Sequence, residues 1–127
     1  MSDDINNITT PIDDRFYRLE GRVPVRCTLA EFAKSMQEDE KRILAQATID
    51  NLQISTIFIG IDQNWGGGDP LLFETVVFGL PDDLQPRWSF SSWDEAMEIH
   101  NLLVATLTEH GAEPLLGEIR KKAEAGG

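Results

Sequence analysis

The chain has 127 residues, 41% of them hydrophobic, which suits a single domain with its own core. Its formal charge of −11 lies entirely in residues 43 to 118, where 12 Asp or Glu face one base, Arg87. Such a surface repels nucleic-acid phosphates and anionic lipids, so we expect neither nucleic acid nor membrane as a direct partner. The acidic surface either serves solubility alone or docks on a basic surface of another protein.

Two absences narrow the class of protein. The sequence has no run of about 18 apolar residues, and the N-terminal MSDDINNITT lacks a signal-peptide pattern, so we expect a cytoplasmic protein. The single Cys27 cannot form an internal disulfide, and no Cys/His cluster has the spacing of zinc ligands. We predict no metal site and no cofactor.

The N-terminal part begins with a polar stretch. Residues 1 to 14 predict a flexible leader. Residues 16 to 26, FYRLEGRVPVR, alternate in part but contain Gly21 and Pro24, which favours an edge or bent strand. That edge either pairs with another copy of the chain or is blunted by Gly21 and Pro24, so the oligomeric state stays open.

Two capping boxes predict where helices begin. Thr28 and Glu31 have the required spacing, so a helix is expected from residue 29 to about 41. Ser92 and Glu95 have the same spacing, and the second helix is expected to run from 93 to about 109, before a glycine. A third, short helix is expected within residues 112 to 127, with a frayed end.

Between the helices, apolar and β-branched runs predict strands at 43–50, 53–62, 71–79 and 87–92. The second and third of these should form an antiparallel hairpin. The predicted fold is therefore α+β in the order β-α-β-β-β-β-α: an antiparallel sheet of about five strands with two helices on one face. Residues 15 to 111 form this single domain.

The segment DQNWGGGDP, residues 62 to 70, is the main candidate binding site. Three consecutive glycines allow close approach of a ligand to the backbone, but no Walker or dinucleotide pattern surrounds them. Trp65 either stacks on a ligand or partner, or folds back as an anchor of the loop. The predicted binding residues are Asp62, Gln63, Asn64, Trp65, Gly66, Gly67, Gly68 and Arg87.

His100 lies in the middle of the apolar face of the second helix, so it should face the sheet. A buried imidazole needs a partner, and Glu74 is the best placed carboxylate, ahead of Asp62. The pair is either a structural contact or a catalytic base with its orienting group, although no nucleophile motif accompanies it. Arg87 is interpreted as the counter-ion of Glu74 or as a ligand contact.

The run STIFIGIDQNWGGGDPLLFETVVFG, followed by RWSFSSWDEAMEIH, resembles a family of small uncharacterised proteins associated with phages, prophages and their hosts. The resemblance covers about residues 16 to 107. Where the family often has a His, this chain has Gln63, and it has Ile99 where the family has a Gly. The matching positions are Asp62, Gly66, Gly67, Gly68, Pro70, Phe73, Glu74, Thr75, Trp93 and His100. The resemblance implies a mobile-element accessory protein and no established activity.

Three functions follow as hypotheses. The first is a non-enzymatic binding module that binds the basic surface of a host protein, such as a defence protein, and blocks it. The second is a small-ligand binder that uses the 62–70 loop. The third is a hydrolase or transferase that uses His100 and Glu74, so enzymatic activity is left undecided.

Overall fold

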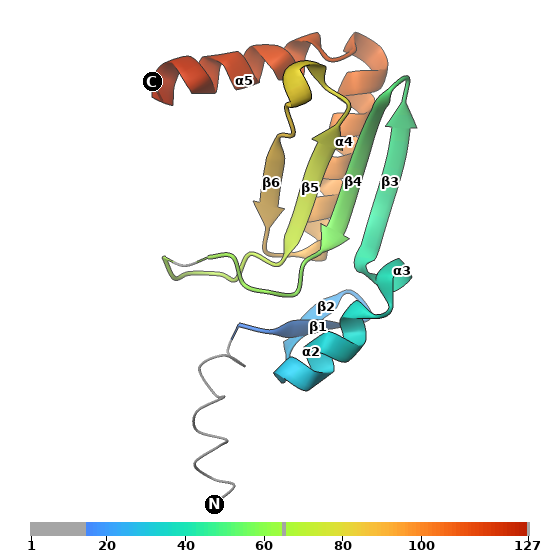
Figure 1. Ribbon diagram of the computed structural model, residues 1–127, viewed down its shortest axis with the longest axis vertical. Helices are drawn as coiled ribbons and strands as arrows, with labels where there is room; N and C mark the ends of the chain where they lie inside the picture. The colour runs from blue at the N-terminus through green and yellow to red at the C-terminus, as the bar shows by residue number, and fades with distance from the viewer. Residues whose placement is uncertain (1–14, 65, 127) are drawn as a thin grey trace, which may run out of the picture.

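The computed structural model describes residues 15–64 and 66–126, with the backbone alone for residues 39, 40 and 123–126 (Figure 1). The predicted leader and Trp65 lie outside the described residues. The elements are, in chain order, β1 (Tyr17–Glu20), β2 (Val23–Arg26), α2 (Leu29–Met36), α3 (Asp39–Arg42), β3 (Ile43–Ile49), β4 (Leu52–Phe58), β5 (Phe73–Phe78), the 3-10 turn η1 (Pro81–Asp83), β6 (Arg87–Phe90), α4 (Trp93–His110) and α5 (Glu113–Gly126).

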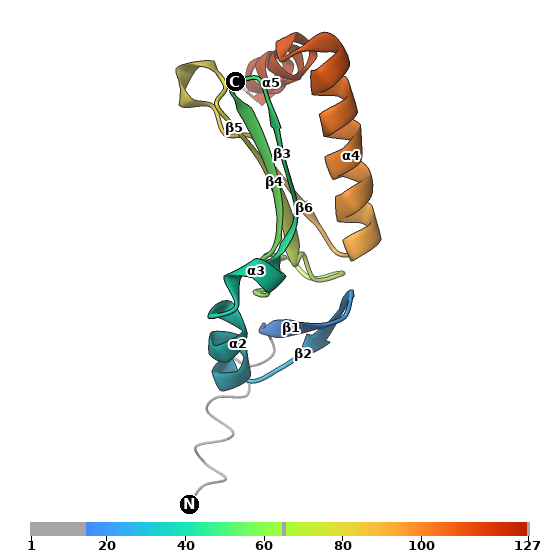
Figure 2. The same ribbon diagram turned by 90° about the vertical axis from the view of Figure 1, so that its right-hand side faces the viewer.

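A four-stranded antiparallel sheet in the order β3-β4-β5-β6 forms the body of the molecule. The long helix α4 lies along one face of this sheet, and none of the described helices lies along the other face (Figure 2). The α+β class and the antiparallel β4–β5 hairpin are therefore confirmed. Each strand presents alternate residues to α4, because successive side chains point to opposite faces.

The N-terminal strand differs from the prediction. Residues 16 to 26 do not form one strand of the main sheet but a separate hairpin, in which β1 pairs with β2. Gly21 makes this possible, because it occupies the turn with a φ of 62° that most residues avoid. Helix α2 packs against this hairpin, so the sheet body carries one covering helix where two were expected.

The first predicted helix is divided in two. Its start is confirmed: the Thr28 hydroxyl accepts from the Glu31 N–H, and the Glu31 carboxylate accepts from the Thr28 N–H, both at 3.1 Å. The helix ends at Met36, however, and a short second helix, α3, follows after Glu38, which has a non-helical backbone. This break redirects the chain into β3, which begins directly after α3.

Backbone hydrogen bonds join the N-terminal hairpin to the segment after β4. Tyr17 N–H donates to the Gly60 carbonyl at 2.8 Å, and Asp62 N–H donates to the Arg15 carbonyl at 2.9 Å. Gly60 has a φ of 78°, and a Cβ there would lie 2.8 Å from the Phe32 ring. The close contact between this segment and α2 therefore requires glycine.

The core between the sheet and α4 has two parts, one at each end of this interface. One is aromatic, with Phe58, Phe73 and Phe90 under the first turns of α4. The other is aliphatic and includes Leu115 and Leu116 from α5. The first turns of α5 therefore belong to the same core as the sheet.

Candidate functional site

The 62–70 loop connects β4 to β5 and is braced from within. Oδ1 of Asp62 accepts from two backbone amides, those of Asn64 at 2.8 Å and Leu71 at 3.1 Å. The Asn64 side-chain amide donates to the Asp69 carbonyl at 2.9 Å. These bonds join the two sides of the loop at its base. The side chains of Asp62 and Asn64 thus hold the loop conformation.

The tip of the loop is exposed. Gly66, Gly67 and Gly68 are all exposed, and the latter two have φ values of 86° and 93°, which favour glycine. Gln63 is exposed too, and its side-chain amide donates to the Ile61 carbonyl at 3.3 Å. Figure 1 shows the loop projecting sideways past β6, away from the sheet. The predicted role of Trp65 stays a prediction, because this residue is outside the described part.

His100 faces the sheet, as predicted, and is 3% exposed. Its partner is not the predicted carboxylate: Nδ1 of His100 lies 2.7 Å from the hydroxyl of Thr56. That hydroxyl lies 2.7 Å from the hydroxyl of Thr75, and both threonines are fully buried. Burial lowers the pKa of His100, because the interior disfavours the imidazolium ion. The imidazole is therefore part of a buried polar contact between α4 and the two central strands.

The predicted His100–Glu74 pair is wrong because the two residues belong to opposite faces of the sheet. The residues on either side of Glu74, Phe73 and Thr75, are fully buried, and Thr75 is joined through Thr56 to His100 on α4. Alternation then directs Glu74 away from α4. Its carboxylate accepts from Nη1 of Arg87 at 3.0 Å.

Arg87 is the counter-ion of Glu74, which confirms the first interpretation of this residue. The pair joins β5 to β6 on the face without a described helix, and the Arg87 side chain is 58% exposed. An exposed pair of this kind contributes little to stability, on the order of 0–1 kcal/mol. Arg87 remains accessible at the surface beside its carboxylate partner.

Thr56 was missed in the sequence, although a signal was present. It lies between Ile54 and Phe58 at the alternate positions of β4 that face α4, so it is the polar residue of a buried row. A buried hydroxyl needs a hydrogen-bond partner, and His100 is the polar residue on the helix face that covers this strand. The pairing could thus have been inferred from alternation together with the helix face.

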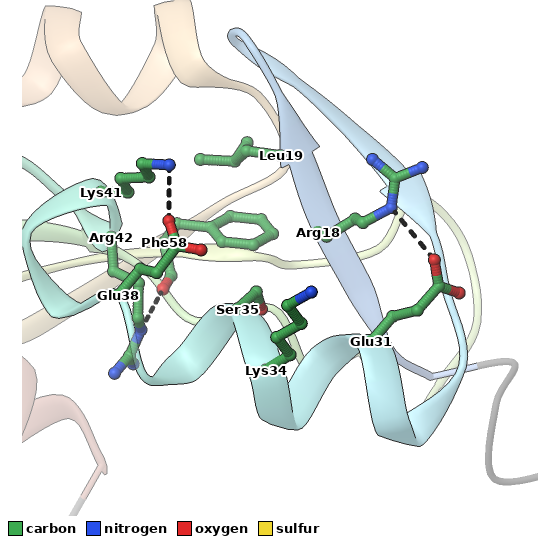
Figure 3. Close-up of a pocket in the computed structure, with 9 residues that line it drawn as sticks. All are labelled: Arg18, Leu19, Glu31, Lys34, Ser35, Glu38, Lys41, Arg42 and Phe58. Carbon is green, nitrogen blue, oxygen red and sulfur yellow. Dashed lines mark hydrogen bonds and ion pairs between the residues drawn. The ribbon is translucent and has the colours of Figure 1, made fainter.

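A pocket of about 350 Å³ was also missed. It lies where the N-terminal hairpin, α2 and α3 meet the end of β4 (Figure 3). Its lining comes from four elements that are up to 40 positions apart in the chain, and no local motif marks it. The lining residues are Arg18, Leu19, Glu31, Lys34, Ser35, Glu38, Lys41, Arg42 and Phe58.

Within the described residues, no three His, Cys, Asp or Glu side chains gather as metal ligands. No helix in this part of the chain is both long and apolar enough to cross a membrane. Comparison with known protein families, curated proteins and solved structures found no match to this chain.

Proposed function

We propose that the protein is a non-enzymatic binding module whose 62–70 loop and acidic surface contact a protein partner with a basic surface. One observation carries this proposal: the loop is braced at its base by Asp62 and Asn64, while its glycine tip is exposed. A loop that is already ordered loses less conformational entropy on binding than a mobile one. Its glycines allow a partner to approach the backbone closely.

The environment of His100 favours a binding role over a catalytic one. Its Nδ1 is bonded to a buried threonine hydroxyl, and Glu74 belongs to the other face of the sheet. A general base must reach the proton that it removes, and a 3% exposed imidazole beneath the sheet offers a substrate little access. The same separation weighs against a small-ligand site built from the loop, Glu74 and His100 together.

The charge distribution suits a basic partner. The region from 43 to 118 carries all of the net charge of −11, and the loop contributes the exposed Asp69. Acidic groups around a contact loop accelerate encounter with a basic surface and repel other acidic proteins. This acceleration weakens as salt screens the charges.

The resemblance to phage-associated proteins suggests the setting. Small accessory proteins of mobile elements commonly act by occupying a surface of host machinery. We therefore propose a host protein, such as a defence protein, as the partner, and occlusion of its basic surface as the mechanism. The resemblance, and not the geometry of the loop, points to this partner.

The test uses charge reversal at the loop with a matched control elsewhere. The tagged protein is cross-linked in its own host, the captured partner is identified and purified, and its Kd is measured with each variant. Asp69→Lys should weaken binding about tenfold, the equivalent of 1.4 kcal/mol. Glu118→Lys changes the net charge of the same acidic region equally, but on α5, at the opposite end of the sheet from the loop (Figure 1), and should have a much smaller effect.

The salt dependence of the association rate is a second test on the same complex. The association rate should fall steeply as salt rises from about 50 to 300 mM. Equal binding by Asp69→Lys and the unmodified chain, together with a flat salt response, would exclude the proposed loop contact.

A further inference from the structure

The pocket of about 350 Å³ at the base of the sheet shares no lining residue with the 62–70 loop, so its role does not depend on the function proposed above. Its volume is within the range of small-molecule sites, roughly 300–1,000 Å³. It also lies where two structural units meet, since β1, α2 and α3 line one side and the end of β4 lines the other. Such junctions are common positions for ligand sites.

The lining is cationic, in contrast to the rest of the chain. Four bases line the pocket, against two carboxylates. Both carboxylates are already engaged: Glu31 holds the helix cap and lies 3.7 Å from Arg18, and Glu38 pairs with Lys41. Glu20 adds a third carboxylate beside the pocket through its pair with Arg18, so the four bases exceed the carboxylates by one, in a protein with a net charge of −11.

Lys34 is the lining base that is most available to pair with a bound anion. The Lys34 ammonium group forms no ion pair with any carboxylate among the described residues. Glu38 is nevertheless close to it: the pKa of Glu38 is lowered mainly by Lys41 and to a smaller extent by Lys34. Figure 3 shows the Lys34 side chain extending from α2 on the pocket side, near Arg18. Arg18 itself is held by Glu20 at 2.8 Å, which fixes its guanidinium beside the cavity.

The pocket also has an apolar part. Leu19 and the ring of Phe58 line it between the charged groups, and Phe58 is held in the aromatic core by Phe73, with 5.3 Å between ring centroids. Figure 3 shows this ring between Leu19 and Ser35. A ligand in this pocket would therefore meet apolar surface and positive charge at the same time.

The walls of the pocket are held in place without a ligand. Tyr17 N–H bonds to the Gly60 carbonyl, and a Cβ at Gly60 would come within 3.2 Å of Met36 on α2. On the other side, Nε of Arg42 donates to the Phe58 carbonyl at 3.4 Å. A preformed pocket binds with a smaller conformational cost than one that must be assembled.

We propose that this pocket binds a small organic anion, a carboxylate or a phosphate ester attached to a flat apolar group. Lys34 is its principal charged contact, and Leu19 is its principal apolar contact, since Phe58 lines the pocket but is only 3% exposed. The charge selects the head group, and the apolar contacts select for an organic anion over inorganic phosphate.

The test is a titration followed by the backbone amide signals in two-dimensional NMR. The probes are phenyl phosphate and benzoate, with benzyl alcohol as the neutral analogue and inorganic phosphate as the head group alone. One or both organic anions should produce saturable shifts centred on Leu19, Ser35 and Phe58. Benzyl alcohol and inorganic phosphate should each bind at least about fivefold more weakly, since each lacks one kind of contact.

Lys34→Gln removes the proposed charge at an exposed helix position and should weaken anion binding about three- to fivefold, as expected for one exposed charge pair. Lys34→Glu should abolish it. Lys121→Gln, at an exposed position of α5 outside the pocket, is the matched control and should bind as the unmodified chain does. The proposal is overturned if neither organic anion gives saturable shifts at the pocket, or if Lys34→Gln and Lys121→Gln behave alike. Equal affinity for benzyl alcohol would also overturn it.

Discussion

The hydroxyl of Thr56 lies 2.7 Å from Nδ1 of His100 and joins the central strand β4 to the middle of α4. The same hydroxyl reaches the Thr75 hydroxyl on β5, so three buried polar side chains form one chain of hydrogen bonds. In an otherwise apolar interface such a contact favours a single register of the helix on the sheet, because any shift leaves these groups without partners.

Titration of His100 should make stability depend on pH. Burial lowers the pKa of His100 from its ordinary value of 6.5, so the unfolded chain binds a proton more readily than the folded chain. The free energy of unfolding should be largest above pH 6.5 and fall as pH drops from there towards the folded pKa. Urea unfolding between about pH 7.5 and 5.5 measures this. In His100→Gln the free energy of unfolding should fall less steeply with decreasing pH. If the two proteins lost stability in parallel over this pH range, the prediction would be contradicted.

Removal of the Thr56 hydroxyl should be costly. Thr56→Val retains the shape of the side chain but leaves His100 and Thr75 with unsatisfied groups, at about 1–3 kcal/mol. Thr56→Ser keeps the hydroxyl and should cost about 1 kcal/mol, for the lost methyl group. Chemical denaturation of both variants gives the comparison. If Thr56→Val were the more stable of the two, the buried contact would have no part in stability.

Gly79 should tolerate no side chain. Its φ is 94°, and a Cβ would overlap the carbonyl oxygen of Asn51 in the neighbouring turn. Gly79→Ala should therefore destabilise the fold by more than about 2 kcal/mol. Gly111→Ala is the matched control, because its φ of 67° and ψ of −161° also favour glycine, but a Cβ there would meet nothing within 4 Å; it should cost about 1–3 kcal/mol and less than Gly79→Ala. Thermal unfolding of both variants measures the difference, and equal losses would contradict the proposed overlap.

Asp62 should control the order of the binding loop. Asp62→Ala removes the acceptor of the Asn64 and Leu71 amides, so local opening should become easier by about 1–2 kcal/mol. Hydrogen exchange at these two amides should accelerate, while exchange in α4 stays unchanged. Asp62→Asn keeps an acceptor oxygen and should retain most of the protection. Unchanged exchange in Asp62→Ala would show that the loop is ordered by other contacts.

Arg87 should contribute little to stability. Its partner Glu74 is 18% exposed, but Arg87 itself is 58% exposed, so water and salt screen the pair. Arg87→Gln should cost less than about 1 kcal/mol, and the difference should disappear at high salt. Denaturation at low and high salt tests this. A loss of partner affinity in Arg87→Gln with normal stability would assign Arg87 to the binding surface as well.

The sequence alone determined the features that depend on neighbouring residues. The first helix starts at the Thr28–Glu31 capping box, and α4 starts at Ser92, whose hydroxyl accepts from the Glu95 N–H at 3.2 Å. The Glu95 carboxylate accepts a hydrogen bond from the Ser91 N–H and not from the Ser92 N–H. The second half of this capping box is therefore shifted by one residue. These signals act over three or four positions and can be read without a tertiary structure.

Tertiary structure alone decided which residues meet across the chain. Both rows of β5 are largely apolar, with Phe73 and Val77 on one side and Val76 and Phe78 on the other, so alternation could not show which row α4 would cover. The choice directed Thr75 inward and Glu74 outward. It also depended on β4, since Thr56 and His100 are 44 positions apart. Local hydrogen bonds leave a pattern in the sequence, whereas contacts between distant segments depend on how whole faces pack, and the cationic pocket arose in the same way.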